Sequence, residues 1–179
     1  MPGSNTQISV VKSMLFGVCI ALAIVLVGMF FNPFAYQASL NTNEKLSIVI
    51  SFSVIPASCL AIAIARLAKH RFFSAQDIVG AGIAKDTAQA QLLQSLLQNT
   101  LEQAVLAFIV YCAWAVVMPS SFLSAIPMAA LAFGLGRIYF FITYTKGAAA
   151  RAIGFTLSFY PSILLLIIII ATLLWGLIN

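Results

Sequence analysis

Polar side chains gather on one face of a segment that otherwise has the composition of a membrane span. Leucine and other apolar residues fill most of residues 91–106, yet polar residues recur at steps of three and four: Gln91, Ser95, Gln98, Asn99 and Glu102. On a helix this spacing places them in one polar stripe. A carboxylate inside a bilayer costs roughly 2.5–3.5 kcal/mol, so it normally has a partner. Glu102 is therefore our first candidate functional residue, the alternative being a carboxylate that only joins two helices.

Arg137 is the second charged residue deep inside an apolar segment. A short uncharged turn joins its segment to that of Glu102, which predicts antiparallel neighbours. At ~1.5 Å of helix rise per residue, both charges lie roughly 13–17 Å from the same membrane surface. Equal depth predicts that Glu102 and Arg137 pair, either within one chain or across a subunit boundary.

A basic and phenolic series lies opposite the polar stripe. Arg137, Tyr144 and Arg151 recur every seven residues, and they form one stripe if the helix continues through the link between the last two apolar segments. Arginine binds carboxylates through two parallel hydrogen bonds, and Glu102 can accept an ammonium group. The two stripes therefore suit a small anionic ligand that also has an amine. The alternative is a packed polar network without a ligand.

Composition excludes a soluble protein. The 179 residues are 63% hydrophobic and 7% charged, with a mean hydropathy of +1.08, whereas soluble domains carry about 25% charged residues. No basic run with interleaved aromatic residues lies outside the apolar segments, so the sequence does not predict nucleic-acid binding. His70 is the only histidine and the three cysteines lack metal-ligand spacing, so we expect no metal site. We interpret His70 as an interfacial cation.

Five apolar segments are long enough to span a bilayer, which predicts an all-α integral membrane protein. They are residues 8–31, 46–65, 91–118, 126–145 and 153–178. The apolar core at residues 14–31 is too long for a typical signal peptide and no A-x-A site follows, so we interpret the first segment as a retained span.

Basic residues favour alternate connections, which predicts an orientation. Lys12 precedes the first span, Lys146 and Arg151 lie in the last link, and the loop at residues 66–89 carries four basic residues: Arg66, Lys69, Arg71 and Lys85. The positive-inside rule then predicts a cytoplasmic N-terminus and an outside C-terminus. We expect the basic loop and the last link on the cytoplasmic side, in a bacterial inner membrane.

In order and spacing, these features resemble the MAPEG family, the membrane-associated proteins in eicosanoid and glutathione metabolism. The sequence RLAKHRFF at residues 66–73 is similar to the basic, aromatic end of the family's first helix. The Asn99-x-x-Glu102 motif and the spacing of Arg137, Tyr144 and Arg151 follow in the family's order. The resemblance implies a four-helix transmembrane bundle at residues 46–179, with residues 1–45 as one additional N-terminal transmembrane helix and its connector.

The resemblance also implies an activity. It implies homotrimers with glutathione between adjacent subunits, open to the cytoplasmic side and bound by Arg66, Gln98, Asn99, Glu102, Arg137 and Tyr144. Arg151 would be the catalytic residue, since a nearby cation favours the thiolate of a thiol whose ordinary pKa is about 8.5. The chain would then be a glutathione-dependent transferase or peroxidase acting on hydrophobic electrophiles, and its partners would be membrane lipids and a lipophilic small molecule from the bilayer.

Three positions depart from the family pattern. Ser95 stands where catalytic members often carry arginine, Gln103 where leukotriene-type members carry tyrosine, and Phe140 where a tyrosine is expected. A non-catalytic MAPEG-like scaffold that binds lipid or a partner protein therefore stays an alternative. A small transporter is a further alternative, although we find no inverted repeats or paired broken helices.

Overall fold

The computed structural model describes residues 4–79 and 86–178, and this part of the chain contains five long helices and no strand. The helices are α1 Ser4–Phe30, α2 Thr42–Phe73, α3 Ala88–Val117, α4 Ala125–Thr143 and α5 Ala148–Ile178. Short 3₁₀ turns at Ser120–Phe122 and Tyr144–Lys146 connect the last three. All five are long and apolar enough to cross a membrane. The predicted all-α, five-span membrane fold is confirmed.

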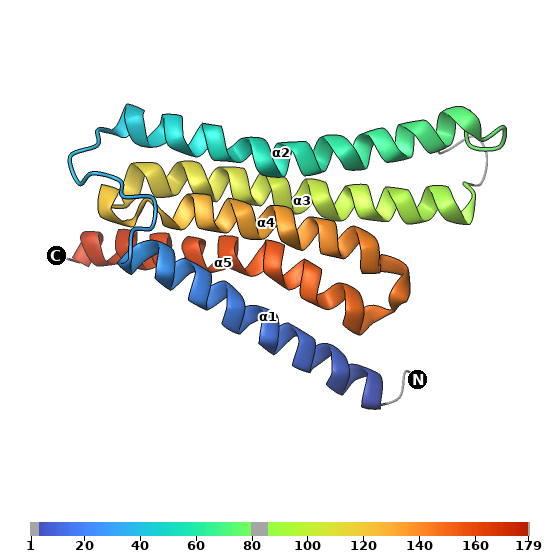
Figure 1. Cartoon of the computed structure of the whole chain (residues 1–179), viewed down its shortest axis with the longest axis horizontal. Coiled ribbons are helices and arrows are strands. Elements are labelled where there is room, and N and C mark those ends of the chain that lie inside the picture. The colour runs from blue at the N-terminus through green and yellow to red at the C-terminus, as the bar shows by residue number, and fades with distance from the viewer. Residues whose placement is uncertain (1–3, 80–85, 179) are drawn as a thin grey trace.

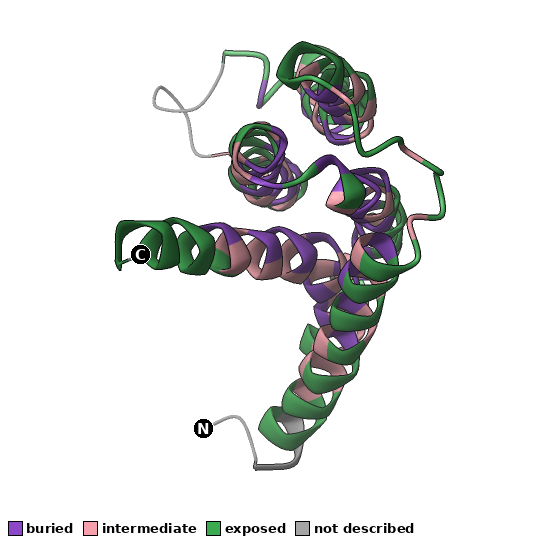
Figure 2. Cartoon of the chain, turned by 90° about the vertical axis from the view of Figure 1, so that its left-hand side faces the viewer, coloured by how far each residue is buried: buried purple, intermediate pink, exposed green. Residues whose placement is uncertain are grey.

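The helices run antiparallel in sequence order, so the two basic connections lie at the same end of the molecule (Figure 1). Lys85 of the predicted basic loop lies outside the described residues. α2 packs along α3, α4 packs along α5, and α1 packs against α5 and α4. We expected α3 and α4 to be close neighbours, but their backbones approach each other at few points. Figure 2 shows α4 as the most enclosed helix, while the N-terminal half of α1 and the C-terminal end of α5 are mostly exposed.

Local sequence explains where α2 and α3 begin. Asn41 and Glu44 form a capping box at the start of α2, each side chain accepting a hydrogen bond from the other's backbone N–H. Thr87 caps α3 by accepting from the N–H of Ala90 at 3.2 Å. α2 continues beyond its predicted end at residue 65 because RLAKHRFF extends the helix after the apolar run has ended.

Polar contacts fix the first connector against the α3–α4 turn. Ser124 Oγ donates to Asn32 Oδ1, and Ser120 Oγ donates to Leu40 O at 3.1 Å. Lys45 Nζ is buried and donates to Met118 O at 2.9 Å. These contacts tie α1 to the rest of the bundle at the end that carries the C-terminus.

Glycine allows α4 and α5 to pack closely at the opposite end. A Cβ on Gly154 would lie 2.5 Å from the backbone N of Phe140, and one on Gly136 would lie 2.8 Å from Gly154 O. Larger side chains at these positions would push the helices apart. This close packing places Phe140 against Phe155, with ring centroids 6.5 Å apart.

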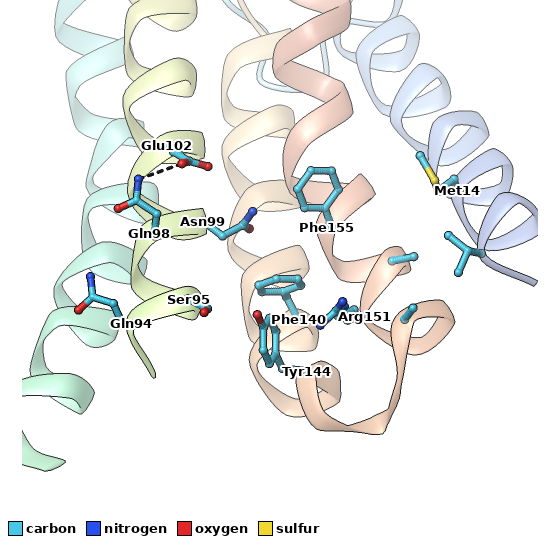
Figure 3. A pocket seen from close by; sticks show the side chains of 13 residues that line it. Met14, Gln94, Ser95, Gln98, Asn99, Glu102, Phe140, Tyr144, Arg151 and Phe155 are labelled. Atoms are coloured by element: carbon cyan, nitrogen blue, oxygen red, sulfur yellow. Dashed lines mark hydrogen bonds between the residues drawn. The ribbon is translucent and has the colours of Figure 1, made fainter. Parts of the chain in front are cut away.

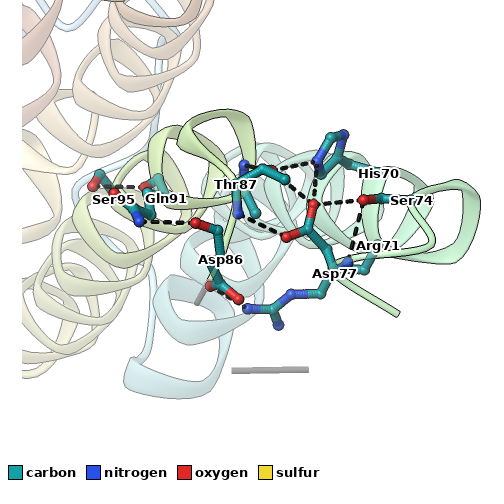
Figure 4. A network of polar contacts seen from close by, with 9 residues as sticks. His70, Arg71, Ser74, Asp77, Asp86, Thr87, Gln91 and Ser95 are labelled. Carbon is teal, nitrogen blue, oxygen red and sulfur yellow. Dashed lines mark hydrogen bonds and ion pairs between the residues drawn. The ribbon is translucent and has the colours of Figure 1, made fainter. Parts of the chain in front are cut away.

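A network around Asp77 joins the end of α2 to the start of α3 (Figure 4). Its buried carboxylate accepts from the Thr87 N–H at 2.8 Å, and from the Thr87 and Ser74 hydroxyls at 2.7 Å each. His70 Nε2 lies 3.0 Å from the same carboxylate. The backbone N–H of Thr87 does most to hold the pKa of Asp77 well below its usual range. Burial opposes that effect, and the Thr87, Ser74 and His70 side chains add to it.

A depressed carboxylate pKa predicts acid sensitivity. The contribution of Asp77 to stability is present above its unfolded pKa of about 3.9, and it is lost as the pH falls below that value toward the folded pKa. We expect Asp77→Asn to unfold at a lower temperature at neutral pH. Its unfolding temperature should also depend less on pH between about pH 5 and pH 2.

Thermal unfolding followed by tryptophan fluorescence in detergent micelles measures both effects. Asp86→Asn is the matched control because Asp86 also lies between α2 and α3 and, among the described residues, has one ion pair, to Arg71 at 3.4 Å. The control should lose less stability at neutral pH. An acid slope in Asp77→Asn as steep as that of the unmodified protein would contradict the prediction.

Candidate functional site

An open groove of about 710 Å³ lies at the end of the molecule that carries the basic connections. α3 supplies one wall, while the end of α4, the α4–α5 link, the start of α5 and α1 supply the rest. Figure 3 shows this arrangement, with Met14 beyond Phe155 on the side away from α3. The lining residues are Val10, Met14, Gln94, Ser95, Gln98, Asn99, Glu102, Phe140, Tyr144, Ala148, Arg151, Ala152 and Phe155.

The α3 wall is polar, as the helical spacing predicts. Gln98 Nε2 donates to Glu102 Oε1 at 2.9 Å, which holds the carboxylate on the exposed face of the helix. Asn99 lies between this pair and the bundle interior, and its Oδ1 accepts a hydrogen bond from Arg137 Nη1 at 2.8 Å. The wall therefore presents an oriented amide and a carboxylate to a ligand.

Tyr144 in the α4–α5 link and Arg151 in the first turn of α5 face this wall. The Arg151 guanidinium lies over the Tyr144 ring, 5.0 Å from its centroid, and Tyr144 makes an edge contact with Phe140 at 5.2 Å. The premise of a continuous helical stripe was wrong. α4 ends at Thr143, and the chain reverses through a 3₁₀ turn and Gly147, whose φ of 104° favours glycine. The two side chains meet because the link folds back.

Arg137 does not line the groove; it is fully buried behind it. Its guanidinium donates to Asn99, to Ser158 Oγ at 2.8 Å and 3.1 Å, and to Thr100 Oγ1 at 3.4 Å. It also lies 4.7 Å from the centroid of the Phe140 ring. The predicted pair of Glu102 and Arg137 within one chain is wrong. Equal depth does not fix the direction of a side chain around its helix axis, and Arg137 points inward while Glu102 is exposed.

Arg66 also lies apart from the groove. Its guanidinium is 5.2 Å from the centroid of the Phe141 ring, and it lines a second cavity of about 400 Å³ on the other side of α3. That cavity also contains Lys69, His70 and Leu93. Within one chain, the structure therefore brings together Gln98, Asn99, Glu102, Tyr144 and Arg151, but not Arg66.

The three positions that depart from the family pattern have different surroundings. Ser95 and Phe140 line the groove. Gln103 is buried, and its Oε1 accepts from Ser158 Oγ at 2.8 Å, so it faces the bundle interior.

Sequence reasoning missed Ser158 and the apolar lining residues Phe155, Val10 and Met14. A serine within an apolar run signals Ser158, and the i, i+4 spacing of Val10 and Met14 is a weak signal for one helix face. Among residues 4–79 and 86–178, no three His, Cys, Asp or Glu side chains gather as metal ligands would.

Comparison with known protein families identifies a match. A sequence model of the MAPEG family matches residues 46–171, which covers most of α2, all of α3 and α4, and most of α5, and leaves α1 outside. Searches of curated proteins and of solved structures find no match.

Proposed function

The chain belongs to the MAPEG family of membrane proteins, and from that premise we propose that it is a glutathione-dependent transferase or peroxidase acting on hydrophobic electrophiles. Family membership alone supports a membrane protein related to glutathione or eicosanoid metabolism. The observation that carries the finer proposal is the groove in which Arg151 and Tyr144 face Asn99 and Glu102.

The groove has complementary groups for a tripeptide that carries two carboxylates and an ammonium group. Glu102 would accept the ammonium, and Gln98 already fixes the direction of its carboxylate. Asn99 accepts from Arg137 through Oδ1, which leaves its donor end, Nδ2, for a ligand carbonyl or carboxylate. Arg137 would act as a positioning residue through Asn99.

Arg151 would stabilise the thiolate. The thiol proton leaves to solvent, the sulfur attacks an electrophilic carbon, an S–C bond forms, and the leaving group departs with the bonding electron pair. The electrophile would enter from the bilayer, since the groove also has apolar walls from Phe140 and Phe155.

Glutathione binding is the first test. We expect glutathione to raise the unfolding temperature of the purified protein saturably, because a ligand that binds only the folded state stabilises it by mass action. Glu102→Gln should weaken binding about 10- to 100-fold, since it removes the charge-assisted bond, worth about 1.5–3 kcal/mol, to the ammonium. Glu44→Gln, at the opposite end of the bundle, is the matched control. Equal affinity in Glu102→Gln and the control would contradict the assignment of Glu102.

We further propose that the site is completed in a homotrimer, with its groove open to the cytoplasm. Arg66 lies on a different face of the chain from Arg151, so one subunit would supply Arg66 to a neighbour's groove. A cyclic trimer repeats the same heterologous contact three times, which gives every groove a neighbour.

Complementation between subunits tests this arrangement. Arg66→Ala and Arg151→Ala chains should each lose turnover when expressed alone. Co-expression of the two variants should restore part of it, because some mixed trimers contain an interface with both arginines intact. As a control, the double variant Arg66→Ala/Arg151→Ala should show no turnover when expressed alone, because none of its trimers contains an interface with both arginines intact. No recovery in the mixed trimers would place Arg66 outside the site.

One observation favours a non-catalytic scaffold as the second candidate. Ser95 lines the groove where catalytic members often carry arginine, and its hydroxyl donates to Gln91 O at 2.9 Å. Glutathione would then lack one carboxylate anchor. Stabilisation by glutathione without turnover of a generic electrophile would support the scaffold.

A further inference from the structure

The groove has an apolar wall from α1, a helix that lies outside the family match. Val10 and Met14 line the groove one helical turn apart. Met14 stands opposite the polar α3 wall, on the far side of Phe155 (Figure 3). The groove is therefore polar at one end and apolar at the other.

The position of α1 follows from close packing along one stripe of the helix. Beyond Met14 the same face continues with Gly17, Ala21, Val25 and Gly28, all buried. A Cβ on Gly17 would lie 1.9 Å from Thr156 Oγ1, and one on Gly28 would lie 2.5 Å from Ala125 Cα. α1 therefore fits against α5 and α4 in one register.

Towards its N-terminus α1 diverges from the bundle (Figure 1). Val10 and Met14 continue the packed face into this diverging part, and both are only half-buried. Where α1 diverges from α5, this face of α1 lines the groove. The small residues Ala148 and Ala152 line the groove from α5, so the apolar end leaves room for a ligand chain.

We propose that α1 is the specificity wall of this protein: Val10 and Met14 determine the length and bulk of the apolar group that the groove accepts beside glutathione. The inference rests on the proposed glutathione-dependent function and adds its substrate class, an electrophile with an unbranched alkyl or slender aryl group. Polar or charged cosubstrates would leave their hydrogen-bonding groups unpaired against Val10 and Met14.

The test measures binding of S-alkyl glutathiones, which carry the alkyl group on sulfur and need no turnover. In the unmodified protein, affinity should rise by about fourfold per added carbon from methyl to hexyl, as expected for a buried methylene. Met14→Trp fills the apolar end and should flatten this rise while leaving the affinity for glutathione itself within about twofold. Met14→Ala should extend the rise to chains longer than hexyl.

Leu15→Trp is the matched control, because Leu15 lies next to Met14 on α1 but is 60% exposed and lies outside the groove. It adds the same indole to the same helix in the same micelle, so it should keep the full dependence on chain length. If Met14→Trp and Met14→Ala both bind glutathione and show the same dependence of affinity on chain length as the unmodified protein, the role proposed for α1 is wrong. The proposed glutathione-dependent function would not be affected by that result. Absence of glutathione binding in the unmodified protein would overturn the proposed function, and the inference that rests on it.

Discussion

Arg137→Ala is expected to destabilise the folded protein by about 3–5 kcal/mol, because it leaves a large cavity and removes the partner of the Asn99 amide. The hydroxyls of Ser158 and Thr100 lose their bonds to Arg137 but stay hydrogen-bonded, since each also donates to another residue. Chemical unfolding in detergent micelles measures the loss. Few other residues in the described part of the chain are both this large and fully buried.

Two further variants separate packing from charge. Arg137→Met fills much of the cavity and removes the cost of burying a cation, so it should recover much of the stability. Methionine cannot orient Asn99, so glutathione should bind more weakly to Arg137→Met than to the unmodified protein. Arg137→Lys keeps the charge but lacks the planar fork that reaches Asn99 and Ser158 together. An Arg137→Ala protein as stable as the unmodified one would contradict the described burial.

The burial of Arg137 also bears on function. Its described contacts are neutral oxygens and aromatic rings, so its charge has no carboxylate partner within the described chain. A cation in a membrane helix is costly, and such residues usually serve a site. Its position directly behind Asn99 indicates that it supports the groove.

Hydropathy predicts most of this fold because the bilayer constrains it strongly. Each span must satisfy its own backbone hydrogen bonds, so a long apolar run predicts a helix with little ambiguity. The residues at which the helices end were less predictable. α2 continues to Phe73 because Arg66, Lys69 and Arg71 are good helix formers, so the helix continues after the apolar run has ended.

The site was predictable where it depends on one helix. The stripe of Gln98, Asn99 and Glu102 follows from helical spacing alone, and all three line the groove. The pairing of Arg137 depends on how α3, α4 and α5 rotate against one another, which spacing does not encode. The α1 wall depends on contacts between residues far apart in the sequence, such as Gly17 and Thr156, and no local pattern predicts them.

Arg151→Ala should reduce turnover far more than it weakens glutathione binding, if the chain is the proposed enzyme. An opposite charge close to an ionisable group lowers an acid's pKa by about 1–3 units. Because a thiol with the ordinary pKa of about 8.5 is about 3% ionised at pH 7, loss of the cation should reduce the thiolate fraction at neutral pH about 8- to 30-fold. The Arg151 guanidinium is half-buried at the groove wall and is held over the Tyr144 ring, so its charge acts from a defined position.

Lys146→Ala is the matched control. Lys146 lies in the adjoining α4–α5 link and contributes the same formal charge as Arg151, but it is exposed and does not line the groove. Its loss should leave turnover near that of the unmodified protein. Arg151→Lys should rescue in part, because a point charge replaces a planar fork.

The decisive measurement is the pH at which bound glutathione ionises, followed by the ultraviolet absorbance of the thiolate. Removing a cation favours the protonated thiol, so this pH must rise in Arg151→Ala and stay unchanged in Lys146→Ala. If it stays fixed in Arg151→Ala while turnover falls, Arg151 positions the substrate and does not activate the thiol. If glutathione bound to the unmodified protein ionises at the same pH as free glutathione, the groove does not activate the thiol. The scaffold then replaces the enzyme as the best account of this chain.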